Sequence, residues 1–167
     1  MPVFTPQTVR TDAGDGTNNP CGPYRAELFS DSGGLTQFGA FVEHLPPGSA
    51  SSIKHWHAGE DEMIYVLSGE VTLHEGDQTT VMRPGEAATF KAGDPAGHCL
   101  RNESGSATSY LVIGTRSPGD VVTYPDDDRV LTWDRLTQTR VWTDHAGRPA
   151  ANPYVLTADP APDTAPE

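Results

Sequence analysis

The sequence predicts an all-β protein, built as a sandwich or a barrel. The 167 residues include 17 glycines and 15 prolines, which is typical of a chain with many turns. Between these turns, β-branched and aromatic residues gather in short runs, the pattern of an all-β sandwich or barrel. The length fits one domain that can bury most of the surface its unfolded chain exposes.

The short apolar runs predict a series of strands separated by tight turns. The segment at 108–114 is the most strongly apolar and is expected to be central. Two later runs, 130–133 and 139–143, are expected to pair as an extra hairpin beyond the barrel. The other expected strands lie at residues 24–29, 37–45, 52–57, 63–67, 71–74, 78–82, 87–91 and 98–102.

The two ends of the chain differ in composition from its middle. Residues 1–23 are rich in Thr, Asp, Gly, Asn and Pro and predict an irregular arm, and 117–128 predicts a turn-rich loop. Residues 157–167 cannot bury apolar surface and are expected to be disordered. In chain order, we expect an arm at 1–23, a barrel at 24–116, an extension with a hairpin at 117–156, and a tail at 157–167.

A pair of histidines suggests a metal site in the middle of the chain. His55 and His57 are two residues apart, and in a strand such residues point to the same face. The strand rise would place the two imidazoles about 6–7 Å apart, so that both can reach one ion. Trp56 between them is then expected to face away from the site and to pack as a core aromatic residue.

Two later residues complete the candidate ligand set. Glu62 follows a short turn and opens the next apolar run, so a hairpin there returns a carboxylate to the two histidines. His98 lies in a second glycine-containing segment and supplies a fourth candidate. Imidazole and carboxylate ligands of this kind leave coordination positions open for water, oxygen or substrate.

These segments resemble the two conserved motifs of the cupin superfamily. The first is Gly48-x6-His55-x-His57-x4-Glu62-x6-Gly69, and the second runs from Gly85 to Asn102 with His98 as its histidine. The resemblance implies a cupin jelly-roll barrel, also called a double-stranded β-helix. It also implies that His55, His57, Glu62 and His98 bind one divalent transition metal.

The ligand set does not select the metal or the reaction. Iron, manganese, zinc and nickel all fit three imidazoles and one carboxylate. With iron or manganese, a dioxygenase is expected; with zinc or another Lewis acid, an isomerase or lyase. A third alternative is a cupin that binds or senses a small molecule without turning it over.

The isomerase reading ranks below the dioxygenase on the sequence alone. Isomerase or lyase chemistry needs a base, and the sequence places no carboxylate in the pocket besides Glu62. A sugar-phosphate substrate would also need basic residues there. By strand alternation, Lys54 faces away from the metal ligands.

Charge and cysteine content predict the compartment and exclude some partners. The net charge of −12 disfavours binding to nucleic acid or to anionic membranes. Two cysteines, Cys21 and Cys99, are too few for a disulfide framework and are expected to be buried free thiols. The chain starts without a secretory signal, so a cytoplasmic protein is expected. The expected partners are a small-molecule ligand or substrate and, from the cupin resemblance, a second copy in a homodimer.

Overall fold

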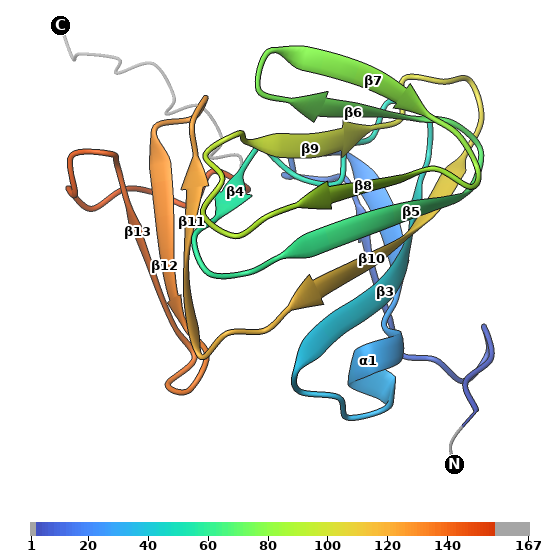
Figure 1. The fold of residues 1–167 in the computed structure, drawn as a ribbon, viewed down its shortest axis with the longest axis horizontal. Coiled ribbons are helices and arrows are strands. Elements are labelled where there is room, and N and C mark those ends of the chain that lie inside the picture. Colours follow the sequence, from blue (N-terminus) through green and yellow to red (C-terminus); the bar gives the residue numbers. More distant parts are fainter. Residues whose placement is uncertain (1–2, 156–167) are drawn as a thin grey trace, which may run out of the picture.

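The structure is a computed structural model that describes residues 3–155 (Figure 1). It is nearly all β, with one short helix, α1 (Phe29–Ser32). The strands are β1 (Thr11–Asp15), β2 (Pro23–Glu27), β3 (Phe38–Leu45), β4 (Trp56–His57), β5 (Glu62–Ser68), β6 (Val71–Glu75), β7 (Gln78–Met82), β8 (Ala87–Phe90), β9 (His98–Arg101), β10 (Thr108–Thr115), β11 (Gly119–Tyr124), β12 (Arg129–Asp134) and β13 (Thr139–Thr143).

Two antiparallel sheets form the barrel. The larger has the strand order β1-β2-β3-β10-β5-β8, and the smaller has the order β7-β6-β9. Figure 1 shows the smaller sheet lying over one end of the larger one. Because β10 pairs with both β3 and β5, the apolar run predicted to be central does lie in the middle of its sheet.

The core lies between these two sheets. Alternate residues of β5, β6 and β10 point inward, as the period of two requires, so each of these strands contributes one face to the core. Leu45, Val66 and Tyr110 are fully buried there. The remaining members of the core cluster are Ile64, Val71, Leu73, Met82, Phe90, Leu100 and Val112.

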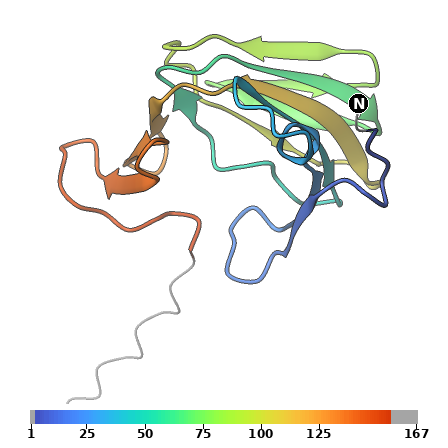
Figure 2. The same cartoon turned by 90° about the horizontal axis from the view of Figure 1, so that it is seen from below.

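A third sheet stands at one end of the barrel, with the strand order β13-β12-β11-β4. Figure 1 and Figure 2 both show strands β11, β12 and β13 of this sheet standing beside the barrel. The sheet has a small core of its own, which includes Val122, Tyr124 and Leu131. Its fourth strand, β4, comes from the middle of the chain, so this sheet reaches back to the predicted ligand segment.

The predicted all-β fold and the C-terminal hairpin are confirmed. Residues 130–133 and 139–143 fall in β12 and β13, which pair as an antiparallel hairpin. Cys21 and Cys99 are buried and free, as expected. No helix within residues 3–155 is long and apolar enough to cross a membrane.

Three expected segments differ from the structure. The irregular arm contains β1, which pairs with β2 and so extends the larger sheet. The turn-rich loop at 117–128 contains β11, which pairs with both β12 and β4. The strand expected at 52–57 is only two residues long, because the backbone before it forms isolated bridges instead. The tail 157–167 lies outside the described residues, and the division of the chain at 23, 116 and 156 stays a prediction.

Candidate metal centre

The four candidate ligands line one cavity of about 330 Å³ inside the barrel. His57 lies in β4, Glu62 is the first residue of β5, and His98 is the first residue of β9. His55 lies just before β4. Its backbone exchanges two hydrogen bonds with His98: the His98 N–H donates to the His55 carbonyl at 2.8 Å, and the His55 N–H donates back at 3.1 Å. This bridge joins the two ligand segments directly.

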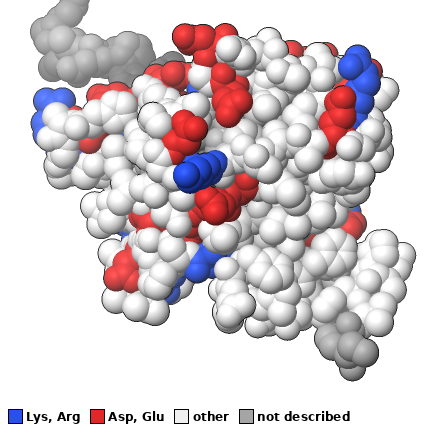
Figure 3. Space-filling view, viewed as in Figure 1, with Lys and Arg blue, Asp and Glu red and all other residues white. Residues whose placement is uncertain are grey.

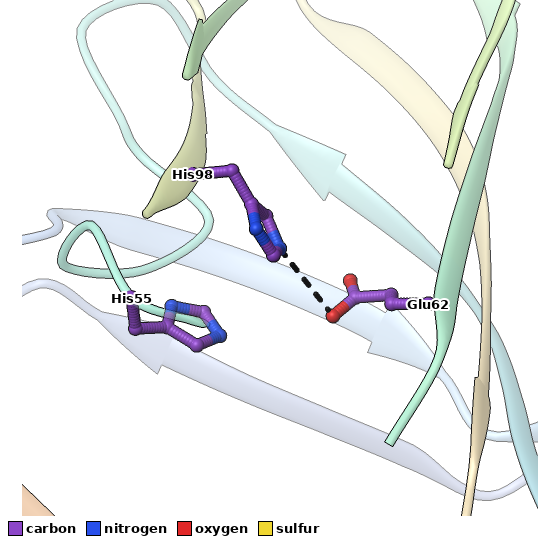
Figure 4. Close-up of side chains that lie close together, drawn as sticks. All are labelled: His55, Glu62 and His98. Carbon is purple, nitrogen blue, oxygen red and sulfur yellow. Dashed lines mark ion pairs between the residues drawn. The ribbon is translucent and has the colours of Figure 1, made fainter. Parts of the chain in front are cut away.

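His55, Glu62 and His98 converge, with one ligand atom of each within 4.8 Å of the other two, and His57 lies beside them. The Nε2 atoms of His55 and His57 are 3.1 Å apart. Glu62 Oε2 lies 3.6 Å from His98 Nε2 and 3.9 Å from His57 Nε2. Figure 4 shows His55, Glu62 and His98 pointing toward one another from three separate segments.

Hydrogen bonds at the outer nitrogens orient two of the rings. His55 Nδ1 lies 2.9 Å from the carbonyl oxygen of Ile53, and His57 Nδ1 lies 2.6 Å from Asp120 Oδ2. The Ile53 carbonyl oxygen can only accept a hydrogen bond. Burial acts to raise the pKa of Asp120, but the hydrogen bonds from His57 and from the Gly59 N–H, together with the charge of His57, lower it below its ordinary value, so this carboxylate also only accepts. Each Nδ1 therefore carries a proton, and in the neutral ring Nε2 presents its lone pair to the shared point.

The charge states of the ligands follow from burial and from each other. Burial, with His57 nearby, lowers the pKa of His55 to about 4, so this ring is neutral at pH 7. Burial also acts to lower the pKa of His57, but the hydrogen bond to Asp120 and the charge of Glu62 raise it above its ordinary value. Burial acts to raise the pKa of Glu62, yet the surrounding histidines lower it. The cluster thus holds an ionised carboxylate beside the neutral imidazole ring of His55.

This donor set fits a transition metal. The side chain of His98 is 6% exposed, and neither ring nitrogen has a hydrogen-bond partner within the described part of the chain. Buried polar atoms of this kind are costly unless something pairs with them. Bonds of about 2.1 Å place neighbouring ligand atoms about 3.0–3.4 Å apart in octahedral or tetrahedral geometry. The 3.1 Å between the Nε2 atoms of His55 and His57 falls in this range, and the 3.6 and 3.9 Å from Glu62 Oε2 to the Nε2 atoms of His98 and His57 lie above it.

Sequence reasoning missed two further residues in this cavity. Glu43 in β3 is buried and accepts a short hydrogen bond from the hydroxyl of Tyr110 in β10. Burial raises the pKa of Glu43 to about 7 and that of Tyr110 well above its ordinary value. The sequence does hold a sign of this. Residues two apart in a strand share a face, so Glu43 lies on the same face of β3 as the apolar residues Phe41 and Leu45.

A second cavity, of about 500 Å³, shares His57, Glu62 and His98 with the first. Trp56 lines it, so the expectation that this residue packs as a core aromatic is wrong; with β4 only two residues long, strict alternation does not hold there. Carboxylates are frequent around this opening, and Figure 3 shows acidic side chains near the middle of this face with basic ones beside them. The carboxylates in the lining are those of Glu60, Asp61, Glu62, Glu75 and Asp94.

Comparison with known proteins identifies the family. The family model described as the cupin domain matches residues 41–114. A crystal structure described as a sugar phosphate isomerase of the cupin superfamily, from Silicibacter pomeroyi, superposes with a TM-score of 0.81. It is 28% identical to this chain and covers 92% of it and 99% of the other chain. This chain is a cupin.

Two other relatives show how far the likeness to named proteins extends. An oxalate-binding protein from Thermotoga maritima is 29% identical to this cupin over 69 residues, which are 41% of this chain and 54% of the relative. The cupin thus spans about half the length of that relative. The polyketide cyclase RemF from Streptomyces resistomycificus is 21% identical, with a TM-score of 0.56 over 70% of this cupin and 80% of that chain, and shares the fold alone.

Proposed function

We propose that this cupin is a metal-dependent enzyme that moves a proton at a carbon next to a carbonyl group, as isomerases and lyases do. The observation that carries this proposal is the position of Glu43. Its carboxyl group lines the same cavity as His55, His57, Glu62 and His98. Glu43 is therefore our candidate for the base that the sequence could not place.

Glu43 and Tyr110 supply the acid and base of this proposal. A carboxyl group with a pKa near 7 is divided between its protonated and ionised forms at neutral pH, the best compromise for taking up and returning a proton. The Tyr110 hydroxyl donates to the Glu43 carboxylate and orients it within the cavity. A metal bound by His55, His57, Glu62 and His98 would polarise the carbonyl oxygen of the substrate.

This proposal changes the ranking drawn from the sequence. The dioxygenase reading depends on the ligand set alone, whereas the isomerase or lyase reading now has a candidate base as well. The likeness to the Silicibacter pomeroyi protein, which is named a sugar phosphate isomerase, also supports it. A binding protein without turnover is the second candidate, favoured by the likeness to the oxalate-binding protein.

The cavities suggest a small substrate with several oxygen atoms, such as a sugar. Volumes of about 330 and 500 Å³ suit a compound of that size. Arg116 and Arg135 line the smaller cavity, but Arg116 is ion-paired with Asp31 and Arg135 with Glu60. Lys91 lines the outer cavity and has no ion pair among residues 3–155, so it would be the side chain that binds a substrate phosphate.

Proton exchange in heavy water tests the proposed function. The metal-loaded cupin would be incubated with aldoses and ketoses, free and phosphorylated, and deuterium at the carbon next to the carbonyl measured by NMR. Wild type is expected to exchange the proton at this carbon for deuterium in one of these substrates. Glu43→Gln is expected to slow this exchange about 10²–10⁴-fold. Lys91→Ala should weaken only the use of phosphorylated substrates.

Two other outcomes would contradict this assignment. Substrate-dependent oxygen uptake would restore the dioxygenase reading. Ligand-dependent thermal stabilisation without exchange or product would favour the binding protein.

The expected homodimer and cytoplasmic location are part of the proposal. Light scattering on the purified cupin and fractionation of cells that express it would test them.

A further inference from the structure

One imidazole of the candidate centre differs from the others in what holds it. His57 Nδ1 donates to Asp120 Oδ2 at 2.6 Å, and the side chain of Asp120 is only 1% exposed. His55 Nδ1 is instead held by the neutral backbone carbonyl of Ile53. A charged, buried acceptor is a stronger constraint on ring orientation and proton position than a neutral one.

Asp120 is itself held in place. Its other oxygen, Oδ1, accepts the backbone N–H of Gly59 at 2.8 Å. Asp120 lies in β11. The residues that follow it in this strand pair with β4, and Val122 stands opposite His57. β11 falls outside the residues 41–114 matched by the cupin domain, so the C-terminal sheet contributes a group that the matched region does not contain.

We propose that Asp120 is a positioning residue that keeps the proton of His57 on Nδ1, so that the Nε2 lone pair faces the metal. This inference rests on the proposed metal site. It makes the C-terminal sheet part of the centre, since the sheet places both the carboxylate and, through β4, the imidazole that it holds.

The inference predicts an unusual order of effects for two substitutions. In Asp120→Asn, the Gly59 N–H still needs an acceptor, so the amide oxygen stays at Oδ1 and the amide NH₂ faces His57. The NH₂ group can only donate, and His57 Nδ1 must then accept. The ring proton moves to Nε2, and the lone pair that would bind the metal is lost. Asp120→Ala imposes no such tautomer, so the near-isosteric variant should be the more damaging one.

Zinc affinity of the full chain tests this order. The dissociation constant for zinc would be measured by competition with a chelator. The proteins compared are wild type, Asp120→Asn, Asp120→Ala and the control Asp144→Asn. Asp144 is a buried carboxylate of the same C-terminal region that binds Arg148. Asp120→Asn is expected to weaken zinc binding about 10–100-fold, Asp120→Ala less, and Asp144→Asn not at all. Thermal unfolding would verify that each variant is folded.

A second measurement needs no metal. Long-range ¹⁵N–¹H correlation spectra of the metal-free protein, at a pH where His57 is neutral, report which ring nitrogen carries the proton. The inference expects Nδ1 in wild type and Nε2 in Asp120→Asn; the same tautomer in both would overturn it, as would unchanged zinc affinity in Asp120→Asn. If wild type binds no zinc but the tautomer still switches, the proposed function fails while the role of Asp120 in holding His57 stands.

Discussion

Glu43 is a carboxyl group whose charge opposes folding. Its side chain is buried in the barrel beside Tyr110, and burial raises its pKa from the ordinary 4.5 to about 7. Between these two values the folded chain holds a proton on Glu43 that the unfolded chain has released. By linkage, the contribution of this group to stability is fully present below pH 4.5 and is lost as pH rises toward 7.

The substitution Glu43→Gln tests this effect on the metal-free protein. From about pH 4.5 to about pH 7, wild type should lose stability relative to Glu43→Gln by on the order of 3 kcal/mol. Urea unfolding of both proteins at several pH values measures the difference. A constant difference across this range would show that Glu43 has an ordinary pKa in the folded chain.

Sequence motifs named the four candidate ligands but not the residues around them. His55, His57, Glu62 and His98 occupy motif positions, and the structure brings His55, Glu62 and His98 together with His57 beside them. Asp120 is 63 residues from His57 along the chain, so only the fold brings these two together. Glu43 was visible only as a carboxylate on the inward face of a strand, and strand register had to be known before that face could be assigned.

At the scale of elements, the turn between β5 and β6 depends on Gly69. Its φ of +72° lies in the left-handed region, and a Cβ added there would meet the carbonyl oxygen of Ala107 at 2.6 Å and the Cα of Thr108 at 2.9 Å. Both of these are backbone atoms, which cannot move without shifting β10. Gly76, in the turn between β6 and β7, has a φ of +53° but open space around it.

These two turns form a matched pair of tests. Gly76→Ala should cost only the left-handed backbone energy, about 1–2 kcal/mol. Gly69→Ala should cost a further 1–3 kcal/mol or so, because the new methyl group also collides with backbone. Chemical unfolding of the two variants measures both costs, and equal costs would show that β10 yields freely beside Gly69.

Elements defined by local pattern were predictable, and those defined by distant pairing were not. β7 and β13 match the expected segments residue for residue. β11 lies in a segment with many turn-forming residues, and its stability comes from pairing with β12 and with β4, far away in sequence. Its alternating buried residues, Asp120, Val122 and Tyr124, were the available signal.

At the scale of the whole molecule, the barrel and the C-terminal sheet meet at the candidate metal centre. The barrel supplies Glu62 and His98, and β4 of the C-terminal sheet supplies His57. The chain carries a net charge of −12, and carboxylates line both cavities. A divalent cation at the meeting point of the two parts would offset this local negative charge and hold the parts together.

Metal content of the purified 167-residue chain tests the central claim most directly. Mass spectrometry would be applied to untagged wild type, to His98→Ala, and to the control His74→Ala, which removes an imidazole that binds Glu103 outside the centre. Wild type and His74→Ala are expected to carry about one equivalent of a divalent transition metal, and His98→Ala to lose it. Wild type that holds no metal, even after reconstitution, would contradict the account.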